Sequence, residues 1–223
     1  MTEQLSQTEE NYLKGIYKLS EKTEKTVNTN AIANEMNTTA ASVTDMLQKL
    51  SAKELIHYEK YRGVTLTEKG NRAATQLVRK HRLWEVFLVE KLQYTWDEVH
   101  ELAEQLEHIQ SSDLVDRLDI FLGNPKFDPH GDPIPDAEGK FTFRKQIELS
   151  EMDAGETGVV VGVQDHSSAF LKYLDLLGLV LGTQVKVLET FEYDRSKKII
   201  AGQSKELILS HKICKNLFIK LTE

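Results

Sequence analysis

Histidine and carboxylate side chains lie between residues 81 and 108 at spacings that suit metal binding. His81 and Glu85 are four residues apart, which places both on one side of a helix. A second group follows and consists of His100, Glu104, Glu107 and His108. At about 100° per residue these four side chains fall within an arc of roughly 100°. We therefore expect a helix with an apolar packing face and a narrow face of imidazoles and carboxylates.

The local charge bears on whether this face binds metal or is simply hydrated. On most hydrated helix faces the signs are interleaved, because like charges at i,i+4 repel by about a few tenths of a kcal/mol. Residues 92–116 contain seven Asp and Glu residues and no Lys or Arg. A bound cation would neutralise them, and a mixed imidazole and carboxylate set suits a divalent transition metal. We predict a metal site, and a hydrated acidic face is the alternative.

Helix signals indicate the elements that hold this cluster. Thr95-Trp96-Asp97-Glu98 has the form of a capping box, so we expect the helix with the second group to begin there. Thr67 is the expected cap of a long helix that runs to about Leu92 and carries the first pair. A further helix is expected over 112–122, with Gly123 as its stop.

Composition excludes several classes of protein. The 223 residues are long enough for one to three domains, and no stretch approaches the ~18 apolar residues of a membrane span. The first ten residues are polar and lack the apolar core of a secretory signal. The single cysteine, Cys214, excludes a disulfide framework and a multi-cysteine zinc site. We expect a protein of the reducing cytoplasm.

The net charge of −7 is unevenly distributed along the chain. Residues 1–82 carry a net charge of +3, residues 83–140 carry −10, and residues 141–223 are neutral. Such asymmetry suggests separate tasks for the three segments.

The basic N-terminal segment has the pattern of a helix-turn-helix. We expect helices over 8–20 and 30–36, the second capped by Asn28 or Thr29, and a third helix capped by Thr38 or Thr39. Small hydroxyl residues near the start of the third helix could approach DNA closely in the major groove. The candidate DNA-contacting residues of this helix are Thr39, Ala41, Ser42, Thr44, Asp45, Gln48 and Lys49.

A predicted hairpin follows, with strands over 56–59 and 64–67 and a turn that carries Lys60 and Arg62. A basic hairpin directly after a helix-turn-helix is typical of a wing, whose cations meet DNA phosphates. A plain three-helix domain with a surface hairpin is the alternative.

The rest of the chain changes from helical to strand-like patterns. All four prolines lie between Pro125 and Pro135, which predicts an irregular loop over 124–143. Beyond it, short segments suggest a small barrel of about 75 residues. The expected strands cover 158–163, 184–191, 198–200, 206–209 and 217–221, with a short helix over 167–177.

With these motifs, the chain resembles the diphtheria-toxin-repressor family of iron- and manganese-dependent transcriptional repressors. The motifs that carry the resemblance are Thr8-Glu9-Glu10-Asn11-Tyr12-Leu13, Val43-Thr44, the stretch from Lys60 to Thr67, the stretch from Arg79 to Glu85, Val99-His100-Glu101, Glu107-His108 and the stretch from Pro129 to Pro135.

The resemblance implies a mainly α fold with a small β domain. Its expected parts are a winged helix-turn-helix DNA-binding domain over 1–74, a helical dimerisation and metal-binding domain over 75–140, and an SH3-like (FeoA-like) barrel over 147–223.

The resemblance also implies metal ligands. One site would use Glu104, Glu107 and His108 with Asn11 from the first helix, where Glu104 favours Mn(II) or Fe(II) over softer metals. Lys14 stands where the binuclear manganese proteins have another Glu, and a Lys there would repel a cation. A second site would use His81, Glu85 and His100. In a streptococcal-type variant, Glu85 would instead act with Asp128, His130 and Asp165.

The implied function is repression of metal-uptake genes, with Mn(II) or Fe(II) as the co-repressor that orders a homodimer on a palindromic DNA operator. Two other functions compete with it. A carboxylate-bridged di-metal oxidase normally needs two Glu-x-x-His repeats, which these ligands lack. A winged-helix regulator of an organic ligand would leave the acid-rich face unexplained.

Overall fold

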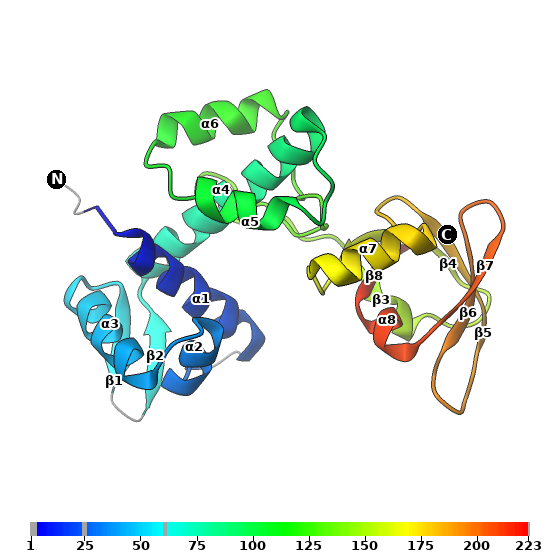
Figure 1. Cartoon of the computed structure of the whole chain (residues 1–223), viewed down its shortest axis with the longest axis horizontal. Helices are drawn as coiled ribbons and strands as arrows, with labels where there is room; N and C mark the ends of the chain where they lie inside the picture. The colour runs from blue at the N-terminus through cyan, green and yellow to red at the C-terminus, as the bar shows by residue number, and fades with distance from the viewer. Residues whose placement is uncertain (1–3, 24–25, 60–61, 223) are drawn as a thin grey trace. The chain divides into compact units, whose positions relative to one another are not determined.

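A helix-turn-helix with a hairpin forms the N-terminal part of the protein (Figure 1). The structure is a computed structural model that describes residues 4–23, 26–59 and 62–222. The helices are α1 (Gln7–Thr23), α2 (Thr29–Glu35) and α3 (Ala40–Ala52). Strands β1 (Ile56–Glu59) and β2 (Gly63–Leu66) pair antiparallel, with Ile56 opposite Leu66.

Local capping explains where the two helices of the turn begin. The Asn28 side chain accepts the amide proton of Ala31 at 2.8 Å, and Thr39 Oγ1 accepts that of Ser42 at 3.2 Å. Asn37 takes a positive φ of 46° between the helices, a conformation that Asn tolerates better than most residues. The helix-turn-helix and the hairpin expected from the sequence are therefore confirmed.

Three helices follow, α4 (Glu68–Leu92), α5 (Val99–Leu106) and α6 (Ser112–Phe121). The α5 helix is shorter than expected at both ends. The Glu98 carboxylate accepts the amide proton of Thr95 at 3.1 Å, but the Thr95 hydroxyl donates to Asp97 at 2.7 Å instead of capping the helix. The helix ends at Leu106, so Glu107 and His108 lie in the turn behind it.

The C-terminal part is built on a six-stranded antiparallel sheet in the order β3-β8-β4-β5-β6-β7 (Figure 1). Its elements are β3 (Ile147–Glu148), the 3-10 helix η1 (Leu149–Glu151), β4 (Thr157–Val163), α7 (Ser168–Leu177), β5 (Gln184–Thr190), β6 (Lys197–Ala201), β7 (Lys205–Leu209), α8 (His211–Lys215) and β8 (Leu217–Leu221). The expected strands are all present, and β3, η1 and α8 are additions that the sequence pattern missed.

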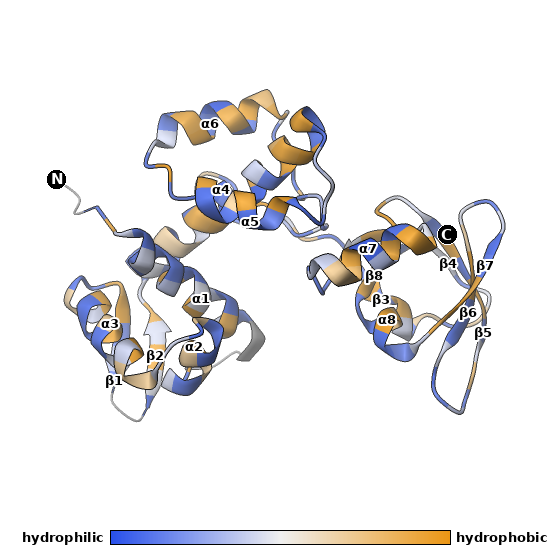
Figure 2. Ribbon diagram, in the orientation of Figure 1, coloured by the Kyte–Doolittle hydropathy of each residue, from blue (hydrophilic) through white to orange (hydrophobic). Residues whose placement is uncertain are grey.

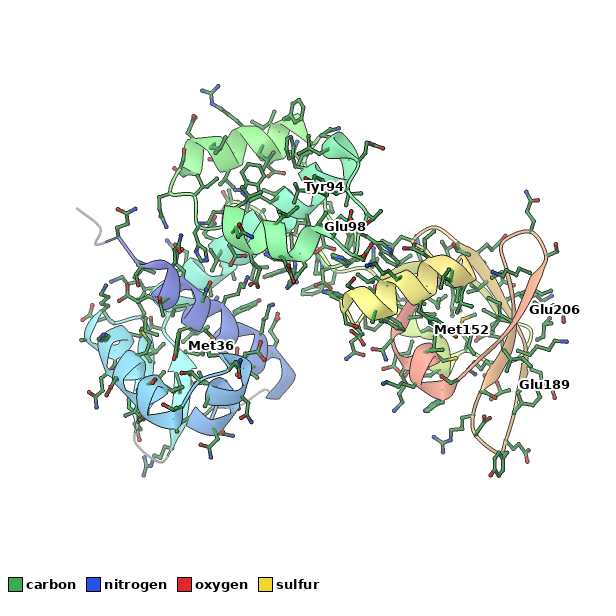
Figure 3. All side chains as sticks on the ribbon, viewed as in Figure 1. Met36, Tyr94, Glu98, Met152, Glu189 and Glu206 are labelled. Carbon is green, nitrogen blue, oxygen red and sulfur yellow. The ribbon has the colours of Figure 1, made fainter. Side chains whose placement is uncertain are left out.

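The core contacts follow the amphipathic pattern of the elements. Figure 2 shows hydrophobic and hydrophilic residues alternating along α6 and α7. One buried cluster joins α1, α2 and α3 to the hairpin, with Ile16 and Leu47 fully buried. Another fills the sheet domain around Met152, labelled in Figure 3, and includes Cys214. Within the described residues, no helix combines the length and the apolar character that a membrane crossing needs.

The packing of the sheet domain predicts that the thiol of Cys214 reacts slowly in the folded protein. Cys214 on α8 is fully buried, and burial raises the pKa of its thiol to about 11. Because the thiolate is the reactive species, we expect iodoacetamide at pH 8 to leave the folded protein unmodified and to alkylate the chain in guanidinium. Mass spectrometry distinguishes the two products. Rapid alkylation of the folded protein would contradict this packing.

Candidate metal centre and nucleic-acid face

Glu85, Asp128 and His130 form a compact group of metal-ligating side chains. Each offers one ligand atom, and these atoms all lie within 4.8 Å of one another. The residues are buried, with exposed fractions of 1%, 5% and 0%. Glu85 comes from α4, whereas the other two come from the proline-containing loop after α6. The structure therefore brings together three of the side chains expected for the streptococcal-type variant.

The His130 ring is held in one orientation. Its Nε2 lies 2.7 Å from the Trp96 carbonyl oxygen, and this contact requires a proton on Nε2 because a carbonyl only accepts. The ring stacks on Trp96 and on His166, with centroid distances of 6.2 and 4.6 Å. Trp96 is in turn anchored by a hydrogen bond of 3.0 Å from its indole to Asp175 on α7. Trp96 and His166 therefore fix the direction in which Nδ1 points.

The His130 Nδ1 atom is the part of the ring left for a ligand. It is buried without a hydrogen-bond partner among the described residues and lies 3.6 Å from Glu85 Oε2. In the neutral ring this nitrogen and the carboxylate are both acceptors, so the pair lacks a positive charge between them. A proton or a metal ion can supply that charge.

The loop that carries His130 is pinned to β4 by its backbone. Gly131 has a φ of +90°, and a Cβ at this position would come within 2.2 Å of the Val161 carbonyl oxygen. The Val163 amide donates to the His130 carbonyl at 2.9 Å, and Arg144 donates to the Gly131 carbonyl at 2.6 Å. Only glycine fits this approach without moving the loop.

Asp128 organises the same loop. Its Oδ1 accepts the amide protons of His130 at 2.9 Å and Asp132 at 3.0 Å, and its Oδ2 lies 3.5 Å from Arg82 Nε. Arg82 also forms an ion pair of 2.9 Å with Asp132. Asp128 Oδ1 therefore holds the turn, and Asp128 Oδ2 lies beside the Arg82 guanidinium.

The electrostatics of this group favour a bound cation. Burial raises the pKa of Asp128, and the Glu85 and Asp132 carboxylates raise it further. Burial by itself would lower the pKa of His130, but its interactions with Glu85 and Asp128 raise it to about 9. Protons thus supply the positive charge that two buried carboxylates require. One imidazole nitrogen with carboxylate oxygens is also a donor set that fits Mn(II) or Fe(II).

Two other expected ligands differ in their contacts, and the first of them, His100, lies beside Glu85 as expected. His100 Nδ1 lies 3.2 Å from Glu85 Oε1, so His100 contacts the Glu85 oxygen that does not face His130. Asp165 accepts the Ser167 amide proton at 2.9 Å at the start of α7 and is absent from the described three-residue group. Its neighbour His166 supplies the stacking contact, and no motif in the sequence indicated that role.

The Glu104, Glu107 and His108 group already has partners. Lys14 Nζ lies 2.6 and 2.7 Å from the two Glu107 oxygens and 3.2 Å from Glu104 Oε1. His81 Nδ1 lies 2.6 Å from Glu107 Oε2, and His108 Nδ1 lies 2.6 Å from Glu10 Oε2.

The partners of Glu107 also lower the pKa of its carboxyl group. Burial would raise its pKa, but the His81 and Lys14 contacts outweigh burial and lower it. Asn11, the expected ligand from α1, lines a cavity of about 140 Å³ with Lys14, Lys18 and Glu104.

The candidate DNA-contacting residues lie on the accessible side of α3. Thr39, Ala41, Ser42, Asp45, Gln48 and Lys49 are exposed, and Thr44 is half-buried. The Thr44 hydroxyl donates to the Ala40 carbonyl at 2.9 Å, so this hydroxyl is held against the backbone of α3. Arg62 at the hairpin is exposed and pairs with Glu59 at 3.0 Å. Lys60 lies outside the described residues.

Comparison with known protein families assigns a description to each part of the chain. Residues 4–64 match the iron dependent repressor N-terminal DNA binding domain, and residues 67–136 match the iron dependent repressor metal binding and dimerisation domain. Residues 147–221 match the FeoA domain. The chain belongs to the diphtheria-toxin-repressor family. Its fold is accordingly a winged helix-turn-helix, a helical domain and an SH3-like domain.

Individual members of this family are similar over most of their length. The iron-dependent repressor IdeR of Mycobacterium tuberculosis is 36% identical over 165 residues, 71% of each chain. The transcriptional regulator MntR of Oceanobacillus iheyensis is 37% identical over 148 residues, which cover 66% of this chain and 94% of that protein. A manganese-dependent transcriptional repressor, solved in complex with manganese, superposes with a TM-score of 0.86 at 34% identity and covers 96% of this chain and 99% of that one.

The close approach at Gly131 generates a test of the site. We expect Mn(II) to raise the melting temperature of the parent protein, and we expect Gly131→Ala to displace the His130 loop and to abolish that rise. Gly155→Ala is the matched control, because Gly155 has a similar φ of +95° but no atom within 4 Å of its Cβ position. The control should lose about 1–3 kcal/mol of stability from backbone strain and keep its response to Mn(II). An unchanged Mn(II) response in Gly131→Ala would contradict the assignment of this loop.

Proposed function

We propose that the protein is a DNA-binding transcriptional repressor that requires Mn(II) or Fe(II). The observation that carries the proposal is the buried Glu85, Asp128 and His130 group, whose ligand atoms lie within 4.8 Å of one another and in which His130 Nδ1 lies 3.6 Å from Glu85 Oε2. The manganese- and iron-dependent repressors among the similar proteins support the same reading. These three residues are the proposed ligands. Asp165 stays a prediction because its carboxylate bonds the Ser167 amide.

Each residue around the ligands has a specific proposed task. A divalent metal held by Glu85, Asp128 and His130 would supply two positive charges in place of the protons of the buried group. Trp96 keeps the proton on Nε2 of His130, so that Nδ1 is the donor atom. His100 holds the Glu85 oxygen that faces away from His130. Asp128 maintains the turn that presents His130.

The DNA-binding part of the proposal rests on α3 and the hairpin. Residues 1–74 would read DNA, with α3 in the major groove and Arg62 against the phosphates. Residues 75–140 would form a homodimer. Exposed fractions of 69% for Ile120 and 64% for Phe121 on α6 support burial against a second copy. A two-fold dimer would recognise a palindromic operator whose half-sites are about 34 Å apart, next to a metal-uptake gene.

Metal binding would select the dimer conformers that fit the operator. The size of the effect equals the difference in metal affinity between fitting and non-fitting conformers. Residues 147–223 contribute β4, on which the His130 loop rests, through the Val163 amide. The third domain would therefore support the loop that presents His130 to the metal.

The direct test is operator binding at controlled metal concentrations. Fluorescence anisotropy would follow the full chain on the promoter fragment of its own gene or of a neighbouring metal-transporter gene. EDTA, Mn(II), anaerobic Fe(II) and Zn(II) would be compared. We expect Mn(II) or Fe(II) to tighten binding about 5- to 150-fold, the usual range of allosteric coupling.

Matched variants give this experiment its control. Glu85→Gln keeps the shape of a ligand but removes its charge and should abolish the response to metal. Glu192→Gln removes a carboxylate from an exposed loop of the sheet domain and should respond as the parent does. DNA binding that ignores EDTA in the parent protein would reject the proposal and favour a regulator of an organic ligand.

A further inference from the structure

We infer that Lys14 is the resident cation of the Glu104 and Glu107 site, and that its ammonium joins α1 to the α5 region without a metal ion. The family resemblance implies a metal at this site, and the residues present do not fit one. The inference goes beyond the proposed function because it concerns a different site and can be tested separately.

The ammonium group of Lys14 has the geometry of a bound cation at this site. Lys14 Nζ has three protons to donate, and the structure provides an acceptor for each of them. They are the two Glu107 oxygens at 2.6 and 2.7 Å and Glu104 Oε1 at 3.2 Å. The side chains of Lys14 and Glu107 are 7% and 0% exposed, so this contact is shielded from water. The two carboxylates thus surround the ammonium as they would surround a metal ion.

Both nearby imidazoles already contact a carboxylate through Nδ1. His108 Nδ1 bonds Glu10 Oε2 at 2.6 Å, and its Nε2 lies 3.9 Å from Glu107 Oε1. The Gln110 amide donates to the other Glu10 oxygen at 2.8 Å, which holds that carboxylate in place. His81 Nδ1 bonds Glu107 Oε2 at 2.6 Å.

The positive charge on α1 also opposes a metal ion at this site. Lys18 follows Lys14 by one helical turn and lines the same cavity of about 140 Å³, together with Glu35 and Glu104. Burial lowers the pKa of Lys18, and the charge of Lys14 lowers it further. Met36, labelled in Figure 3, also lines this cavity. A divalent ion entering here would meet two ammonium groups, where the Asn11 amide could offer only a neutral oxygen.

The two clusters therefore have different roles. The contact between α1 and the α5 region persists at any metal concentration, because a side chain of the protein supplies its positive charge. The Glu85, Asp128 and His130 group then holds the metal to which the protein responds. Only this last step rests on the proposed function.

The inference is tested by counting the Mn(II) ions bound to the full chain. Isothermal titration calorimetry and the electron paramagnetic resonance signal of free Mn(II) both give this number. We expect Glu104→Gln to leave the number and the affinity of bound ions unchanged. Glu104 is half-exposed, with 47% of its side chain accessible, so this variant tests the site without disturbing the core. Loss of one Mn(II) per chain in Glu104→Gln would overturn the inference.

A gain of metal provides the complementary test. Lys14→Glu replaces the ammonium by a carboxylate and should bind one Mn(II) per chain more than the parent. The double variant Lys14→Glu/Glu104→Gln should lose that additional ion. Failure of a folded Lys14→Glu variant to gain an ion would contradict the inference.

A stability measurement covers the case in which Lys14→Glu does not fold. Lys14→Met leaves Glu107 without its ammonium partner and should lower the melting temperature equally in EDTA and in Mn(II). Lys53→Met is the control, because Lys53 pairs with Glu9 at 2.8 Å in a more accessible position. Its melting temperature should fall less. A melting temperature of Lys14→Met equal to that of the parent would reject the inference.

These outcomes are separable from failure of the proposed function. A parent protein that binds DNA regardless of metal would end the repressor proposal. Lys14→Glu could still gain one Mn(II), and the inference on Lys14 would then hold.

Discussion

Buried carboxylates need positive partners, and this requirement organises the helical part of the protein. An ionised carboxylate removed from water is strongly unfavourable unless a cation or several hydrogen-bond donors compensate for it. Glu107 has Lys14 and His81, and the buried Glu10 has His108 at 2.6 Å. Glu85 lies 3.2 Å from His100 Nδ1 and 3.6 Å from His130 Nδ1, and Asp128 accepts two backbone amide protons and lies 3.5 Å from Arg82. A divalent ion would add positive charge between the two buried carboxylates of the second group, whereas Lys14 already supplies positive charge to Glu107.

Local signals accounted for most of the fold. The caps Asn28 and Thr39 and the helical spacing of apolar residues lie within a few positions of the elements that they define, so the sequence alone indicated α2 and α3. The short β3 and α8 were missed because two to five residues show no measurable period. The early end of α5 was also missed, since the capping motif at Thr95 formed a turn instead.

The candidate site was less predictable because its partners are distant in the sequence. The absence of Lys and Arg from 92–116 suggested a bound cation, but Lys14 comes from α1, more than 90 positions before Glu107. The spacing of Glu104 and Glu107 revealed a shared helix face and could not reveal that partner. Asp128 and His130 entered only through the family resemblance, and the stacking by His166 had no signal at all.

The most direct measurement of this account is the anomalous scattering of manganese from crystals of the full chain loaded with Mn(II). The account predicts a peak bounded by Glu85, Asp128 and His130, and no peak between Glu104 and Glu107, where Lys14 Nζ should remain. A peak between Glu104 and Glu107 with Lys14 displaced, or no peak beside His130, would contradict it.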